Sequence, residues 1–134
     1  MPFVKDTFEM LNDAAANKKR ILFEGAHGIM LDLDWSPYPF ATASNTVAGS
    51  INTGSGLPLR SLNNVIGIVK AFTSRVGEGP LPTEIHGRLA DSIRERGGEY
   101  GTTTGRARRI GWLDLEAVRF SCKINNVNEL VITK

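Results

Sequence analysis

Apolar residues recur at helical spacing in two stretches of the chain. These stretches predict helices over about 5–17 and 114–124, each with one apolar face. The apolar positions are Val4, Phe8, Leu11 and Ala15 in the first stretch and Leu113, Ala117, Phe120 and Ile124 in the second. A third, shorter helix is predicted from Asp91, as its N-cap, through Arg96, with Gly97 and Gly98 ending it.

Runs of apolar residues, many of them β-branched, predict strands at 21–23, about 64–76 and 129–134. The first run is expected to be a buried strand that feeds a tight turn. Alternating strands and helices predict an α/β fold with a mainly parallel sheet and flanking helices. Because neither an internal repeat nor a linker interrupts the sequence, residues 1–134 are expected to form a single segment without an internal domain boundary.

Two long loops, over about 34–56 and 77–111, interrupt these elements. The first is rich in Gly, Pro, Ser, Thr and Asn, with room for a short helix near 44–49. Loops longer than about 12–15 residues are usually functional or disordered. We therefore expect the order of both loops to depend on ligands or on additional protein.

The composition narrows the class of protein. A net charge of +2 over 134 residues is too small to indicate a nucleic-acid-binding face. Cys122 is the only cysteine, which excludes an internal disulfide and fits a reducing compartment. No apolar run is long enough to span a bilayer, and the first residues lack a signal-peptide core. The sequence predicts a cytoplasmic protein with no nucleic-acid or membrane partner.

The densest candidate chemistry lies between residues 99 and 114. Three threonines bounded by glycines are followed by three arginines within four positions. Hydroxyls, open backbone amides and guanidinium groups suit the oxygens of carboxylates and phosphates, which arginine can bind through two parallel hydrogen bonds. The alternative is a solvated basic loop that precedes a helix, since charged loops are common on protein surfaces.

This run resembles the aspartate-binding loop of the adenylosuccinate synthetase family. Further blocks follow the order and spacing of that family from about Ile21 onward. They are FEGAHG at 23–28, LDLD at 31–34, YPFATASNT at 38–46, KAFTSRVGEGP at 70–80, PTE at 82–84 and LVITK at 130–134. The resemblance covers only the middle portion of the family's sequence.

The resemblance implies a GTP-dependent ligase of purine (AMP) biosynthesis. In the family, GTP phosphorylates the 6-oxygen of IMP, and the amine of L-aspartate then displaces the phosphate to form adenylosuccinate. Mg²⁺ is the implied cofactor, with ligands expected outside this chain, and the full-length enzyme is expected to be a homodimer. The family's glycine-rich phosphate loop, its catalytic Asp, Lys and His, and the Asp that reads guanine have no counterpart here. The chain is thus expected to be a central segment that is inactive alone and holds no metal ligand.

The resemblance also implies roles for the residues of the threonine-rich run. The aspartate-binding positions are Thr102, Thr103, Thr104, Gly105, Arg106, Ala107 and Arg108. Ala107 stands where the family often has a basic residue or proline, with little expected consequence. Arg106 would also contact IMP, and Arg108 would approach the GTP phosphates. Lys134 would stack its aliphatic stem along the guanine.

Two more positions are implied for IMP. His27 stands where the family carries a glutamine that supports the 6-oxygen during its phosphorylation. An imidazole donates one hydrogen bond, reaches less far and can be cationic near neutral pH. His27 is therefore either a supporting group with altered activity or a tolerated loop histidine. Thr42 would donate its hydroxyl to the IMP phosphate, although Trp35-Ser36-Pro37 departs from the family's usual turn.

Two other classes of function remain open. One is a non-catalytic remnant or pseudoenzyme, which His27 and the missing family motifs favour. The other is a small anion- or nucleotide-binding module that uses the basic cluster at 106–109 on its own. Recoverable flanking motifs would indicate an enzyme segment, scrambled flanks a remnant, and ligand-dependent folding of this chain a module.

Overall fold

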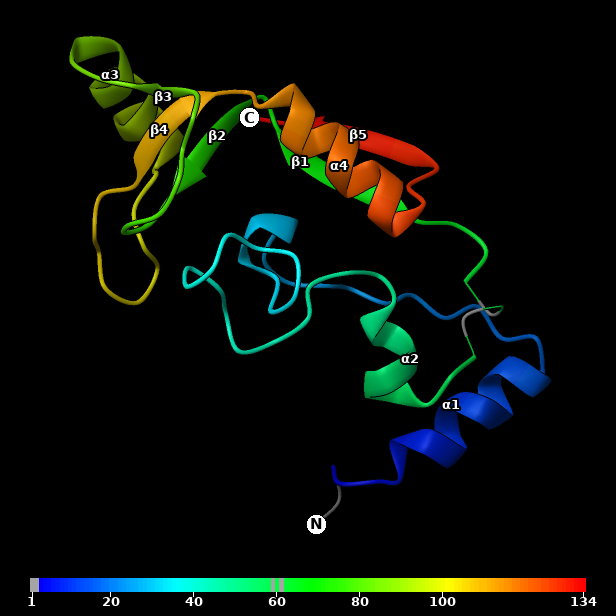
Figure 1. The fold of residues 1–134 in the computed structure, drawn as a ribbon. Coiled ribbons are helices and arrows are strands. Elements are labelled where there is room, and N and C mark those ends of the chain that lie inside the picture. The colour runs from blue at the N-terminus through cyan, green and yellow to red at the C-terminus, as the bar shows by residue number, and fades with distance from the viewer. Residues whose placement is uncertain (1–2, 59, 61) are drawn as a thin grey trace.

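The computed structural model describes residues 3–58, 60 and 62–134. The helices are α1 (Thr7–Ala16), the 3-10 turn η1 (Ile29–Leu31), α2 (Ser50–Ser55), α3 (Arg88–Gly97) and α4 (Leu115–Asn125). The strands are β1 (Ile66–Lys70), β2 (Phe72–Arg75), β3 (Glu84–Ile85), β4 (Arg109–Trp112) and β5 (Glu129–Thr133). Figure 1 shows α1 and α2 at one end of the molecule and both sheets, with α3 and α4, at the other.

The first sheet pairs β1 with β5 in parallel, with Ile66 opposite Glu129 and Lys70 opposite Thr133. This confirms the predicted parallel α/β arrangement and the final strand. Helix α4 leads into β5 and runs alongside the pair (Figure 1). Parallel strands are usually covered on both faces, yet Ile68 is 69% and Ile132 65% exposed. Much apolar surface of this sheet therefore faces solvent.

The second sheet is antiparallel, in the order β2-β4-β3. Ile110 of β4 is fully buried, and Ala90 of α3 is 2% exposed, so one part of the core lies between this sheet and α3. The prediction of one strand over 64–76 was wrong. The chain changes partners at Ala71, whose N–H still donates to the Thr133 carbonyl at 3.0 Å, and β2 then pairs with β4. The second long loop likewise holds β3, α3 and the start of β4.

Local capping explains the helix boundaries. Asp114 caps α4 by accepting a hydrogen bond from the Ala117 N–H at 3.0 Å, so the helix predicted over 114–124 is confirmed. Helix α1 has the same kind of cap at Asp6 and is also confirmed. Helix α3 ends at Gly98 in the left-handed conformation, as predicted, with φ 60°. It begins at Arg88, however, so Asp91 lies in its first turn and pairs with Arg94 at 2.6 Å.

Two predictions in the first half of the chain were wrong. Residues 21–23 form no strand in the described structure, and Leu22 is 91% exposed, because no neighbouring strand pairs with this segment. The short helix expected near 44–49 occurs instead as α2. Polar side chains of this segment bind other residues instead: Asn45 donates to the Asp34 carboxylate at 2.6 Å, and the Thr46 hydroxyl donates to Asp32. Within the described residues, no helix is long and apolar enough to cross a membrane.

Candidate functional site

The threonine loop, residues 101–106, is a hairpin between α3 and β4. Its neck is the antiparallel bridge between Tyr100 and Ala107. The N–H of Gly101 donates to the Arg106 carbonyl at 2.8 Å, and the N–H of Gly105 donates back to Gly101 at 2.8 Å. Gly105 has φ 65°, a conformation that costs glycine little. The hydroxyl-bearing residues and Arg106 are exposed, so the loop presents its donors to solvent.

A buried carboxylate anchors this neck. Glu99 is 1% exposed and accepts hydrogen bonds from Lys70 Nζ at 2.6 Å and Arg108 Nη1 at 2.9 Å. Lys70, at the end of β1, also donates to the Ser74 hydroxyl at 2.9 Å. Burial raises the pKa of Glu99, but hydrogen bonds and charge from Lys70, with further hydrogen bonds from Ser74 and Arg108, outweigh burial and hold this pKa below its usual value. The neck is therefore an ion-paired junction.

The next arginine serves a different glutamate. Arg109 binds both carboxylate oxygens of Glu84, with Nε donating at 2.8 Å. Its Nη1 donates to the carbonyls of Gly79 at 2.7 Å and Gly77 at 3.2 Å, which shapes the turn after β2. The hydrogen bond from Arg109 lowers the pKa of Glu84. Arg109 thus has a structural role, because it connects Glu84 to the turn after β2. Its neighbour Arg108 lies beside the threonine loop.

Sequence reasoning missed both glutamates. Glu84 lies 25 positions before Arg109, and Glu99 lies 29 positions after Lys70. The one available signal was charge balance, since Glu84 and Glu99 lie, with two further glutamates, in the same long loop as Arg108 and Arg109. The pairing of Glu84 with Arg109 depends on the antiparallel pairing of β3 with β4, which the apolar pattern did not predict.

A second buried carboxylate organises the first long loop. Asp32 is fully buried, and its Oδ1 accepts from the N–H groups of Asp34 at 2.9 Å and Trp35 at 3.1 Å, while Oδ2 accepts from Thr46. Burial raises the pKa of Asp32, but the three backbone donors outweigh it, so the pKa is lowered. Thr42 is half-buried in this loop, and its N–H donates to the Leu31 carbonyl at 2.7 Å.

His27 precedes the same loop in an unusual backbone conformation. Its φ is 64°, which is uncommon for a residue with a side chain. The residue is exposed, and in the described part of the chain its imidazole makes no hydrogen bond. The Thr46 hydroxyl donates to the Gly28 carbonyl at 3.1 Å, so the His27 turn and the Asp32 loop are tied together. His27 and Thr42 therefore belong to one local unit.

Arg75 joins this unit to the second sheet. Its guanidinium lies 5.8 Å from the centre of the Phe40 ring and donates to the Phe40 carbonyl at 3.3 Å. Its Nε donates to the Glu78 carbonyl at 2.7 Å. Burial lowers the pKa of Arg75, with repulsion from Arg109 adding to the effect. The segment that carries Thr42 is thereby held against the turn at 77–79.

The two residues predicted for GTP approach the same end of α3. Lys134 donates to the Gly97 carbonyl, two residues before the Glu99 that binds Arg108. In the part of the chain that the structure describes, neither Thr42 nor His27 forms a hydrogen bond with Arg106. The structure thus groups the predicted positions into two units, one around Asp32 and one around Glu99.

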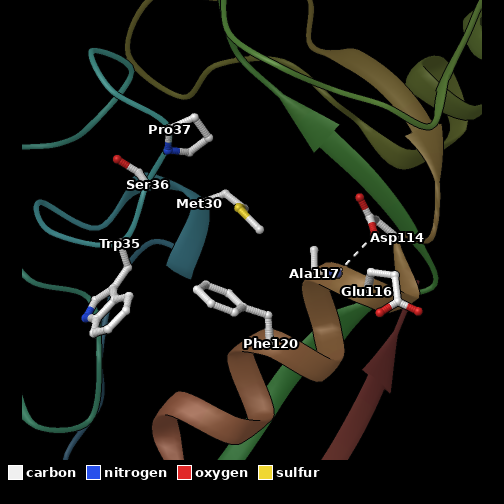
Figure 2. Close-up of a pocket in the computed structure, with 8 residues that line it drawn as sticks. All are labelled: Met30, Trp35, Ser36, Pro37, Asp114, Glu116, Ala117 and Phe120. Atoms are coloured by element: carbon white, nitrogen blue, oxygen red, sulfur yellow. Dashed lines mark hydrogen bonds between the residues drawn. The ribbon is translucent and has the colours of Figure 1, made fainter.

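A hollow borders the unit around Asp32, since Trp35, whose N–H binds Asp32, is one of its lining residues. It has a volume of about 480 Å³ and separates the 30–37 segment from α4 (Figure 2). The rings of Trp35 and Phe120 meet edge to face across it, 6.1 Å apart. It is lined by Met30, Trp35, Ser36, Pro37, Asp114, Glu116, Ala117 and Phe120. None of these is a predicted ligand-binding residue, so the candidate site consists of exposed loops. Within the described ranges, no cluster of His, Cys, Asp and Glu could hold a metal ion.

Comparisons with known proteins agree on one family. The adenylosuccinate synthetase family profile matches residues 1–134. The chain is 56% identical to a chloroplastic adenylosuccinate synthetase of Chlamydomonas reinhardtii over 133 residues, and 51% identical to that of Thermus thermophilus. These alignments cover 99% of this chain but only 29% and 33% of those relatives.

Solved structures show the same likeness. The fully ligated adenylosuccinate synthetase of Plasmodium falciparum superposes with a TM-score of 0.94 at 40% identity, over 98% of this chain and 31% of that one. The succinoaminodeoxyadenylate synthetase of cyanophage S-2L, bound to dGMP and dATP, gives a TM-score of 0.77 at 25% identity, over 96% of this chain and 39% of that one. The matched chain is thus about a third of the length of these proteins.

Proposed function

This chain belongs to the adenylosuccinate synthetase family, a ligase family of purine biosynthesis, and from that premise we propose that it supplies the aspartate-binding loop of the enzyme. It would also contribute parts of the IMP and GTP sites for GTP-dependent formation of adenylosuccinate. Because the chain spans about 30% of its curated relatives, the activity of the whole enzyme is part of this proposal.

The exposed threonine loop carries the proposal. Thr102, Thr103 and Thr104 present hydroxyls, and Arg106 presents a guanidinium, on a hairpin whose neck is fixed by ion pairs. L-Aspartate has two carboxylates, and each can accept several hydrogen bonds from hydroxyls, amides or a guanidinium. A fixed neck with exposed donors limits the ordering that binding would require.

The remaining residues would bind nucleotides. Arg108 and Lys134 would place positive charge near the GTP phosphates, where it stabilises phosphoryl transfer. His27 and Thr42 would contact IMP, the former with an exposed imidazole in place of the family's glutamine. These groups bind and orient, and no general acid or base is assigned to this chain.

Magnesium, dimerisation and location complete the proposal. The described residues do not form a cluster that fits Mg²⁺, so no step is assigned to the metal here, and its ligands are proposed to lie outside them. The homodimer and the cytoplasmic location are likewise proposed from the family. The relatives named as chloroplastic offer a plastid as the alternative compartment.

The first test is ligand binding by the 134-residue chain. In amide NMR spectra of the labelled chain, L-aspartate should shift the signals of Thr102 to Gly105, and Arg106→Ala should abolish the shifts. Arg119→Ala is the matched control, since it removes the same charge from an exposed arginine of α4 that pairs with Glu116. Absence of L-aspartate binding, or equal losses in both variants, would contradict the proposal.

An activity assay separates binding from catalysis. The chain is mixed with IMP, L-aspartate, GTP and Mg²⁺, and adenylosuccinate is measured by chromatography. Because the family's acid–base residues have no counterpart here, we expect binding without product. Product formation by these 134 residues would show that this chain carries catalytic groups of its own.

A further inference from the structure

The two glutamate–arginine pairs at the start of β4 differ in charge balance. Glu99 is shared by two cations, Lys70 and Arg108, so this group has one net positive charge. The pair of Glu84 with Arg109 is neutral. The side chains of Lys70 and Arg108 are 31% and 27% exposed, while that of Glu99 is 1% exposed. At the Glu99 group, the two cations are therefore partly exposed to solvent, whereas the carboxylate is buried beneath them.

We propose that Glu99 is a positioning residue that presents Lys70 and Arg108 together to a polyphosphate at the base of the threonine loop. This inference rests on the proposed function and extends it, because it assigns roles to Glu99 and Lys70, for which the family resemblance gave none. The carboxylate does not contact the anion. It fixes the separation and direction of the two cations that do.

Backbone contacts make this arrangement specific to Arg108. The N–H of Arg108 donates to the Glu99 carbonyl at 3.0 Å, so both the main chain and the side chain of Arg108 are bound to one residue. Arg94 Nε donates to the Arg108 carbonyl at 2.8 Å, and the Glu99 N–H donates to the Arg94 carbonyl at 2.8 Å. Arg108 is therefore held from several sides.

The location favours a chain of phosphates over a single carboxylate. Lys134 donates to the Gly97 carbonyl at the end of α3, close to Glu99 in the sequence. Three cations thus reach one region from β1, the neck of the loop and β5. Cations are also favoured beside a helix C-terminus, because the last carbonyl groups carry partial negative charge. An anion with several charged oxygens can engage these cations together, as arginine and lysine commonly do with phosphate.

The decisive comparison is Glu99→Gln against Glu84→Gln, with inorganic triphosphate as the probe and calorimetry as the measurement. Each variant raises the net charge by one, so a purely electrostatic account predicts tighter binding by both. Positioning predicts about tenfold weaker binding for Glu99→Gln, equivalent to one charge-assisted hydrogen bond, and unchanged or slightly tighter binding for Glu84→Gln. Equal or tighter binding by a folded Glu99→Gln variant overturns the inference.

Glu99→Asp provides the second variant if Glu99→Gln does not fold. It keeps the charge and shortens the side chain, so it should weaken triphosphate binding at least fivefold if direction matters. Unchanged affinity overturns the inference. In wild type, the guanidinium NMR signals of Arg108 should be resolved and should broaden in either variant, which a change of net charge alone would not cause.

L-Aspartate separates this inference from the proposed function. Its affinity should change less than that of triphosphate in either Glu99 variant, since Arg108 is the one implied aspartate-binding position that pairs with Glu99, whereas Arg106 and the threonines do not. A wild-type chain that binds triphosphate but not L-aspartate would remove the aspartate role and leave the positioning role intact. A wild-type chain that binds L-aspartate but not triphosphate would overturn the positioning role alone.

Discussion

Each of the two candidate loops is organised around a buried carboxylate, but the donors differ. Asp32 accepts hydrogen bonds from backbone N–H groups of its own loop, whereas Glu99 accepts them from two charged side chains, Lys70 of β1 and Arg108 at the neck of the hairpin. The first arrangement fixes the path of the chain around Thr42. The second fixes the position of charges beside the threonine loop. A buried carboxylate can thus shape a loop or arrange the charges beside it, depending on its partners.

Asp32→Asn should produce the largest effect on stability. An amide has only one acceptor oxygen, and its NH₂ group would face a backbone N–H of Asp34 or Thr46 and leave that donor unpaired. We expect a loss of about 2–3 kcal/mol in the free energy of unfolding, measured by urea denaturation. Asp34→Asn is the control, because Asp34 is exposed and accepts one side-chain hydrogen bond from Asn45. Similar losses in both variants would contradict the role of Asp32.

Low pH should reduce the stability that Asp32 and Glu99 each contribute, and high salt should distinguish the two contributions. The folded pKa values of Asp32 and Glu99 lie below their ordinary values of 3.8 and 4.5. Their contribution is therefore complete above about pH 4.5 and is lost as the pH falls through the folded values. As the pH is lowered from about 4.5, the urea concentration at the midpoint of unfolding should decrease. The decrease should be less steep in Asp32→Asn and in Glu99→Gln. High salt should reduce the Glu99 contribution more, because ion pairs are screened. Equal salt dependence would remove the distinction.

Arg75→Lys should have the smallest effect, confined to the connection between the two units. Lysine lacks the planar group that lies over Phe40 and contacts two carbonyls. We expect a loss of about 0.5–1 kcal/mol, visible as faster amide hydrogen exchange in residues 38–46. Arg119→Lys on α4 is the control. Faster exchange throughout the molecule would show that Arg75 supports the whole fold instead.

Local signals in the sequence predicted what local contacts determine. Asp114 begins α4, Gly98 ends α3, and the apolar run at 129–134 forms β5, because caps and periodicity act over a few residues. The break of the predicted strand at Ala71 depends on which strands lie opposite, which no local pattern encodes. The binding roles of the threonine loop came from the family resemblance and stay predictions, although the structure exposes the loop.

Because the chain changes partners at Ala71, the two sheets on either side of this residue can form at different times during folding. The antiparallel sheet closes with hydrogen bonds between residues 29 and 39 positions apart, Thr83 with Trp112 and Thr73 with Trp112. The parallel pair requires Val65 to meet Asn128, 63 positions later. Shorter closures cost less entropy, and segments nearer the N-terminus leave the ribosome first. We therefore expect β2, β3 and β4 to pair during synthesis, and β1 to remain unpaired until β5 has been synthesised. The threonine loop would then acquire its hairpin before Lys70 is anchored beside it.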